Sequence, residues 1–155
     1  MTIFVPLPLP SDQQIDEFED IVLKRSYHVT NRSLIREALQ GSALSNPAGK
    51  ILSLSGDAIL RHILVDQGRD RNKSPEEIQN VITIVASNNN LWNRGIAIGL
   101  DPFLVRHPGQ QGIPVGKNVM ANSMEAIIGA VYYDSDRNLE DCERVMAILG
   151  LSWPE

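Results

Sequence analysis

Two polar stripes within otherwise apolar segments carry the side chains of this chain that are best placed to do chemistry. Asp57 follows Ser53 by four residues and Lys50 by seven, so in a helix the three project from one face. Glu125 lies three residues after Asn122 in a second apolar segment. A charged residue on a core helix either faces solvent or needs partners, because an unpaired buried charge is costly. The spacing alone favours the plainer alternative, two solvated carboxylates on ordinary helix faces.

Helices are the elements that must position these acids, since strand-like alternation is nearly absent from the sequence. Ser11 with Gln14, and Ser74 with the proline and acids after it, mark two helix starts. The apolar pattern predicts six or seven helices, over about residues 12–25, 33–41, 48–68, 75–85, 91–99, 119–131 and 139–149. An extended proline-rich arm is expected over residues 1–11 and a long loop over 101–116. The sequence therefore predicts one all-α domain over residues 12–155.

Two glycines stand beside the candidate acids. Gly56 lies in the interior of a predicted helix, where glycine costs about 1 kcal/mol relative to alanine. Gly129 lies four residues after Glu125. We expect these glycines to let two helices approach closely next to the acids, although ordinary core packing would explain them equally well.

Composition excludes several classes of protein. The chain has 155 residues, enough for a single core, and its one cysteine, Cys142, rules out an internal disulfide and a cysteine-rich zinc site. This cysteine usage favours a reducing, intracellular compartment. No apolar run reaches the ~18 residues that a membrane span needs. The 14 basic and 19 acidic residues give a net charge of −5, so contact with a nucleic acid would depend on local basic patches.

Four ordered segments resemble the ribonuclease III family. Residues 50–60, KILSLSGDAIL, are similar to the family signature ERLEFLGDAVL, and residues 121–130, ANSMEAIIGA, resemble the family pattern ADxxEALIGA. The family pattern is also matched by Glu37-Ala-Leu39 and by residues 90–100, NLWNRGIAIGL. The resemblance implies a helical endonuclease domain in which two signature helices pair across a dimer axis. It also implies four carboxylates per subunit that hold magnesium for hydrolysis of double-stranded RNA.

The resemblance assigns roles to the two polar stripes. It implies that Asp57 and Glu125 are catalytic carboxylates and metal ligands, with Asn122 as a weaker ligand. It also identifies three altered positions, because Ser53, Asn122 and Lys50 stand where the family has acids. The four metal carboxylates and the leading glutamate of the family pattern occupy five positions, and the side chains at these positions here have a summed charge of −1, so Mg²⁺ or Mn²⁺ should bind weakly. Lys50 is open to two readings, binding a phosphate in place of a cation or pairing with an acid and blocking the metal.

The resemblance to a dimeric nuclease requires two further surfaces. For the homodimer we expect the apolar residues of the signature helix to form the interface, namely Ile51, Leu52, Leu54, Ile59 and Leu60. For RNA the candidates are basic residues of the predicted loops, namely Arg69, Arg71, Lys73, Arg106 and Lys117. Solvated loops are the alternative for the basic set. No double-stranded-RNA-binding domain is expected in the sequence.

Two functions follow from these features. The first is a divergent, metal-dependent endoribonuclease that cleaves double-stranded RNA as a homodimer. The second is a catalytically inactive ribonuclease III fold that serves as an RNA-binding or ribonucleoprotein assembly component. Loss of three acids favours the second hypothesis, and retention of both Asp57 and Glu125 favours the first.

Overall fold

The computed structural model describes residues 9–40, 47–106, 109 and 112–155, and these form helices without a strand. The helices are α1 (Asp12–Ile21), α2 (Arg32–Gln40), α3 (Pro47–Asp70), α4 (Pro75–Val85), α5 (Asn88–Ala97), α6 (Lys117–Asp134) and α7 (Leu139–Ile148). A 3₁₀ turn at Asp101–Phe103 follows α5. The predicted all-α class is confirmed. Most of the predicted arm, residues 1–8, lies outside the described part of the chain.

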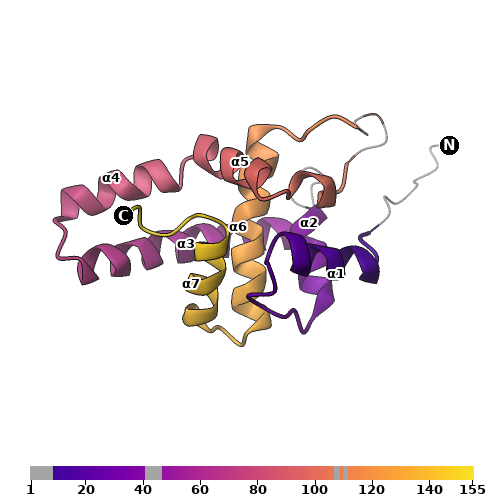
Figure 1. Cartoon of the computed structure of the whole chain (residues 1–155), viewed down its shortest axis with the longest axis horizontal. Coiled ribbons are helices and arrows are strands. Elements are labelled where there is room, and N and C mark those ends of the chain that lie inside the picture. Colours follow the sequence, from indigo (N-terminus) through magenta and orange to yellow (C-terminus); the bar gives the residue numbers. More distant parts are fainter. Residues whose placement is uncertain (1–8, 41–46, 107–108, 110–111) are drawn as a thin grey trace.

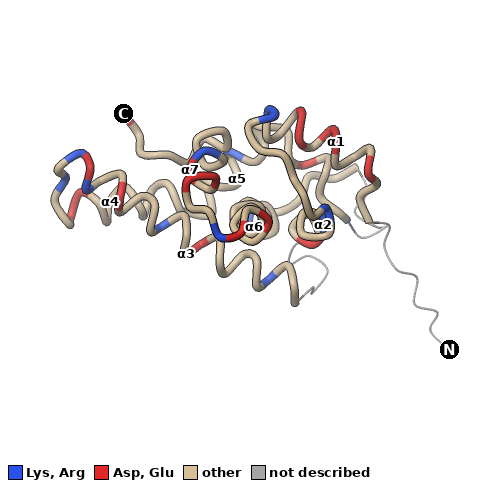
Figure 2. Tube along the Cα trace, turned by 90° about the horizontal axis from the view of Figure 1, so that it is seen from below, with Lys and Arg blue, Asp and Glu red and all other residues tan. Residues whose placement is uncertain are grey.

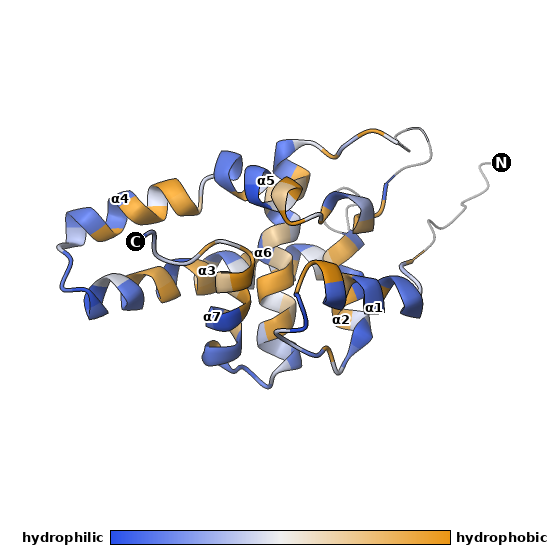
Figure 3. Ribbon diagram, viewed as in Figure 1, coloured by the Kyte–Doolittle hydropathy of each residue, from blue (hydrophilic) through white to orange (hydrophobic). Residues whose placement is uncertain are grey.

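Helix α6 is the centre of the molecule. Every residue from Met120 to Val131 is buried except Asn122, because the helix is built almost entirely from apolar and small residues. Helices α2, α3, α5 and α7 all contact it, and Figure 1 shows α6 running through the middle of the fold with α3 crossing it. The hydrophobic colouring of Figure 3 follows α6 and the inward faces of its neighbours. None of the described helices is long and apolar enough to cross a membrane.

Helices α3 and α6 cross in direct backbone contact at two glycines. A Cβ atom added to Gly56 would lie 1.6 Å from the carbonyl oxygen of Glu125. A Cβ atom added to Gly129 would lie 2.1 Å from the carbonyl oxygen of Leu52. Each helix therefore contributes one glycine to a crossing that any side chain at either position would push apart. The close approach expected beside the acids is present.

The end of α6 positions the segment that leads into α2. The Asp134 carboxylate accepts hydrogen bonds from the Tyr27 hydroxyl (2.5 Å) and from the backbone N–H groups of Thr30 (2.9 Å) and Asn31 (2.5 Å). These three hydrogen bonds to the Asp134 carboxylate hold the segment before α2 in place. Helix α2 is thereby held against α6, the helix that carries Glu125.

Several helix boundaries differ from those predicted, and two of the differences have a local cause. Helix α1 ends at Ile21 rather than near residue 25, because Lys24 and Arg25 adopt positive φ angles of 50° and 56° that a helix does not allow. The helix predicted over about residues 91–99 begins earlier, at Asn88. The asparagine run before Leu91 forms its first turn, since the Ser87 side chain caps the helix by accepting from the backbone N–H of Asn90 (3.1 Å).

The second half of α3 and the whole of α4 project from the body as a helical pair, visible on the left of Figure 1. The chain after α7 braces this pair. The Gln67 side-chain oxygen accepts from the backbone N–H of Trp153 (2.7 Å), and the indole packs where Gly68 has no side chain. Arg71 forms an ion pair with Glu155. The projection therefore depends on contacts from residues that are distant in sequence.

Candidate functional site

Asp57 and Glu125 meet where α3 crosses α6. Gly56, whose missing side chain allows the contact with the Glu125 carbonyl, immediately precedes Asp57. Glu125 is buried with 8% of its surface exposed, whereas the Asp57 side chain is 40% exposed. The site thus has one carboxyl group inside the protein and one at its surface. The structure brings together the two acids that the sequence singled out.

The electrostatics of Glu125 reflect the closeness of the two carboxyl groups. The pKa of Glu125 is raised to about 8, mainly by burial and also by hydrogen bonding with Asp57 and repulsion from the Asp57 charge. The positive charge of Arg61 opposes this rise of the Glu125 pKa. A buried carboxyl beside a second carboxyl needs a proton or a cation to balance it. The arrangement is therefore one in which a proton and a cation compete.

Arg61 was not among the candidate residues, yet it contacts the acid pair. Its Nε donates a hydrogen bond to Oδ1 of Asp57 at 3.0 Å, one helical turn further along α3. Both side chains are partly exposed, 48% for Arg61 and 40% for Asp57. The i, i+4 spacing of an acid and a base is a signal that could have identified this pair from the sequence.

The altered family positions surround the acids on the same two helices. Ser53 and Asn122 are half-buried, one turn before Asp57 on α3 and one turn before Glu125 on α6. Lys50 is exposed near the start of α3. Within the described ranges, no group of three or more His, Cys, Asp or Glu side chains is placed to hold a metal ion. The folded site therefore contains the same two carboxylates that the sequence predicted, Asp57 and Glu125.

This donor set suits one hard divalent ion rather than two. Magnesium commonly uses one or two protein carboxylates and retains several waters, and Asp57 with Glu125 supplies that number. Asn122 adds an amide whose oxygen is a suitable further ligand. The adjoining carboxyl groups, one of them buried, are an arrangement that a cation would stabilise. Two metal ions would need more negative charge than this site contains.

The five basic candidates for RNA binding do not form one patch. Arg71, paired with Glu155, also donates to the backbone oxygen of Gln67 (2.9 Å), and Lys73 lies 3.8 Å from the Glu77 carboxylate. Figure 2 shows Lys and Arg interleaved with Asp and Glu along the α3–α4 projection. Arg69 is exposed at the end of α3. These residues form a mixed-charge tip rather than a purely basic surface.

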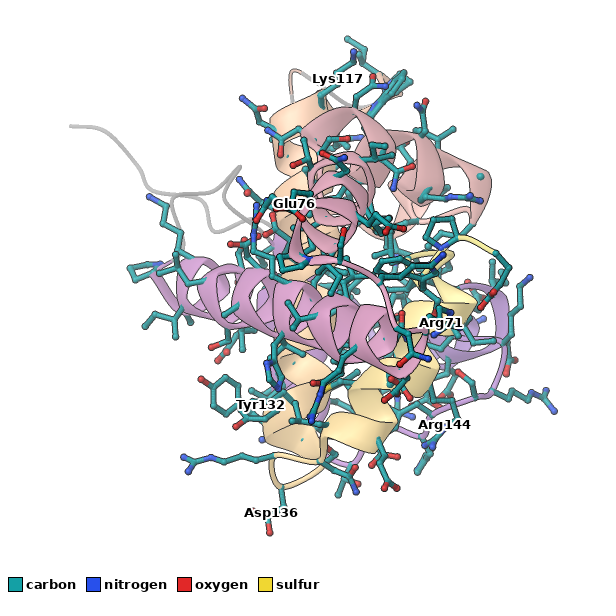
Figure 4. The ribbon with its side chains drawn as sticks, turned by 90° about the vertical axis from the view of Figure 1, so that its left-hand side faces the viewer. Arg71, Glu76, Lys117, Tyr132, Asp136 and Arg144 are labelled. Atoms are coloured by element: carbon teal, nitrogen blue, oxygen red, sulfur yellow. The ribbon has the colours of Figure 1, made fainter. Side chains whose placement is uncertain are left out.

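The other two basic candidates lie elsewhere. Lys117, exposed at the start of α6, donates to the Asn89 side chain (3.0 Å) and stands 5.4 Å from the centre of the Trp92 ring. Figure 4 shows Lys117 and Arg71 on separate parts of the surface. Arg106 is only 10% exposed because it pairs with Asp101 and donates to two backbone oxygens of its own loop. Its guanidinium holds that loop together, so Arg106 has a structural position rather than the exposed one expected for RNA contact.

Part of the exposed surface of α3 is apolar, beside exposed polar residues of the same helix such as Arg61 and His62. Ile51 is 58% exposed, Leu54 is 73% exposed and Val65 is 40% exposed, and Ala58 lies on the same face. We call these four residues the α3 stripe. The predicted dimer surface is corrected in part, since three of its five residues, Leu52, Ile59 and Leu60, are buried in the core of the monomer.

Known proteins similar to this chain share its fold and sequence pattern. The family model "Ribonuclease III domain" matches residues 50–136, more than half of the chain. Ribonuclease 3 of Fusobacterium nucleatum subsp. nucleatum is 31% identical over 140 residues, covering 83% of this chain and 58% of that protein. Ribonuclease 3 of Vibrio vulnificus is 28% identical over 122 residues, covering 76% of this chain and 54% of the relative. This chain thus spans little more than half the length of these relatives.

The solved structures agree with the sequence matches. The nuclease domain of ribonuclease III from Campylobacter jejuni superposes with a TM-score of 0.74 at 16% identity, covering 85% of this chain and 94% of that one. A second structure of the same domain gives a TM-score of 0.71 at 17% identity. At this identity the likeness establishes the fold, while the family is established by the sequence. The chain belongs to the ribonuclease III family.

Proposed function

We propose that this protein is a divergent ribonuclease III-type endonuclease that hydrolyses phosphodiester bonds of double-stranded RNA as a homodimer. One divalent ion, Mg²⁺ or Mn²⁺, would be held weakly between Asp57 and Glu125 with help from Asn122. The observation that carries the proposal is the meeting of the two carboxyl groups at the glycine crossing of α3 and α6. Family membership supports the reaction class.

Each residue has a distinct task in this proposal. Glu125, buried with 8% of its surface exposed, would present its carboxylate to the ion from inside the protein. Asp57 supplies the second negative charge from the solvent side, where RNA would arrive. When bound, the divalent ion supplies Lewis-acid polarisation of the scissile phosphate. Asn122 contributes a neutral oxygen ligand, so the site is weaker than one built from acids alone.

The α3 stripe supports the proposed homodimer. Ile51, Leu54 and Ala58 follow one another at helical spacing on an exposed face, and leaving such a face in water is unfavourable. A two-fold axis would pack the stripe of one protomer against the same stripe of its partner, so that the same residues lie on both sides of the interface. Arg69, Arg71, Lys73 and Lys117 would then contribute RNA-phosphate contacts from each protomer.

The buried thiol supports an intracellular location. Cys142 is fully buried, and burial raises the pKa of its thiol to about 12. Cys142 is the one cysteine of the sequence and is free, and a free cysteine without a disulfide is typical of reducing, intracellular compartments.

Cleavage of double-stranded RNA by purified full-length protein tests the proposal. Wild-type protein should cleave in Mg²⁺ or Mn²⁺ and stop when the metal is chelated. Glu125→Gln should abolish cleavage while keeping the helical circular dichroism spectrum and the dimer mass. Glu76→Gln is the matched control, because Glu76 is exposed on α4 away from the crossing. Equal cleavage by Glu125→Gln and wild type would show that the acid pair is not the active site.

A specific observation favours a second function. Ser53 and Asn122 bring no charge, Arg61 pairs with Asp57, and the raised pKa of Glu125 favours its neutral form, so the site is close to electroneutral without a metal. The second candidate is accordingly an inactive ribonuclease III fold that binds RNA as a dimeric assembly component. Absence of metal binding, together with RNA binding that Glu125→Gln leaves unchanged, would establish this alternative.

A further inference from the structure

Arg61 occupies a position where it must interact with any cation bound at the acid pair. Its Nε–Asp57 Oδ1 bond of 3.0 Å uses one of the two carboxylate oxygens that Asp57 offers to a metal ion. Arg61 and Lys50 both lie on the same face of α3 as Asp57. Arg61 follows Asp57 by four residues, and Lys50 precedes Asp57 by seven. The solvent side of the acid pair is thus flanked by two cationic residues.

We propose that Arg61 is a built-in competitor of the divalent ion, and that the Arg61–Asp57 ion pair closes the metal site until the ion displaces the guanidinium. This inference rests on the proposed function, because it concerns the regulation of the same metal site. Arg61 is a gating residue in this scheme rather than a catalytic one. Its charge takes the place of part of the metal charge in the free protein.

The ion pair is suited to exchange. Both partners are partly exposed, and i, i+4 pairs in contact with solvent are weak, so breaking the bond leaves α3 intact. The released guanidinium can extend into solvent, since 48% of the Arg61 side chain is already exposed. A buried partner would have made the same displacement far more costly. The site can therefore switch between an arginine-closed and a metal-open form without a change of fold.

The effect on metal affinity follows from charge. A positive charge about 6 Å from a divalent ion lowers its affinity by about tenfold in surroundings as polar as water, and by less at physiological salt. Competition for Oδ1 acts in the same direction. Removing the charge of Arg61 should therefore tighten metal binding by about tenfold at low ionic strength.

Binding of Mn²⁺ alone, measured by isothermal titration calorimetry at one fixed pH and low salt, tests the proposal without reference to activity. Full-length wild type is compared with Arg61→Gln, which removes the charge, and with Arg61→Lys, which keeps it. Arg94→Gln is the control, since Arg94 is an exposed arginine on α5 and its loss changes the net charge equally. Circular dichroism verifies that every variant is folded.

The proposal predicts tighter Mn²⁺ binding by Arg61→Gln, with Arg61→Lys and Arg94→Gln within about twofold of wild type. Equal affinities of wild type and Arg61→Gln would overturn the competition while leaving the metal site in place. Tightening by Arg61→Lys as large as by Arg61→Gln would also overturn it, because side-chain shape rather than charge would then be responsible. No detectable Mn²⁺ binding by any variant would refute the proposed metal-dependent function, and the competition with it.

Discussion

Replacing Glu125 by glutamine should change how the stability of the protein depends on pH. The pKa of Glu125 is raised from 4.5 to about 8 in the folded protein, so the folded state binds this proton more tightly than the unfolded state. The contribution of this proton to stability is complete below pH 4.5 and is lost as the pH rises through about 8. Wild-type protein should therefore become less stable across this window through the ionisation of Glu125.

The size of the effect follows from the pKa shift. At 1.36 kcal/mol per pKa unit, raising the pH from the ordinary pKa of Glu125 to neutrality removes about 3 kcal/mol. This figure is an upper bound, because water reaching the site when Glu125 ionises would reduce the penalty. Glutamine has the same shape and no charge to bury, so the variant should lack this component of the pH dependence.

Urea unfolding between about pH 5 and pH 8 measures the difference directly. The free energy of unfolding of Glu125→Gln minus that of wild type should increase with pH. Glu76→Gln should show no such trend, since Glu76 is exposed. A difference between Glu125→Gln and wild type that stays constant with pH would refute the placement of a buried carboxyl group next to Asp57. Saturating Mn²⁺ should reduce the trend, because the metal replaces the proton as the balancing charge.

Further substitutions test the packing and the surfaces. Gly56→Ala should destabilise the fold by about 3 kcal/mol or more in thermal melts, since its Cβ would overlap the crossing helix, whereas Gly109→Ala, with nothing within 4 Å, should have little effect. Leu54→Asp should convert a dimer to a folded monomer in light scattering, because Leu54 is 73% exposed on the α3 stripe. Arg106→Ala should lower the melting temperature through loss of its loop bonds, whereas Arg69→Ala should leave the melting temperature unchanged and weaken RNA binding at low salt.

Local sequence signals predicted most of the secondary structure because the helices are amphipathic and several are capped. The capping boxes at Ser11 and Ser74 are both formed, and the long buried helices were recognisable from their apolar period. The errors lie where local rules compete. Val22 and Leu23 continue the apolar pattern of α1, and both side chains are buried in the core. They nevertheless lie in the turn after α1, because an apolar side chain can be buried without its backbone being helical.

The roles of the charged residues were less predictable than the helices. Arg106 stands in a proline- and glycine-rich loop, and its composition indicated a solvated cation. Only the fold shows that Asp101 and two backbone oxygens enclose its guanidinium. Arg61 was recognisable in principle from its spacing to Asp57, but the significance of that spacing depends on Glu125, 64 residues further along the chain. Pairs of this kind become visible only when the helices are placed in space.

The glycine crossing explains how the site can keep its geometry after losing most of its acids. Because Gly56 and Gly129 bring main chain against main chain, the separation of α3 and α6 is set by the backbone and not by the side chains around it. Ser53 and Asn122 consequently stand one turn from the two acids on helices already fixed in register. Carboxylates restored by Ser53→Glu and Asn122→Asp would enter a preformed frame, so they should strengthen metal binding without refolding the site. In this protein the backbone crossing sets the geometry of the site, whereas a few side chains on the two helices set its charge. Metal affinity can therefore change without a change in the fold.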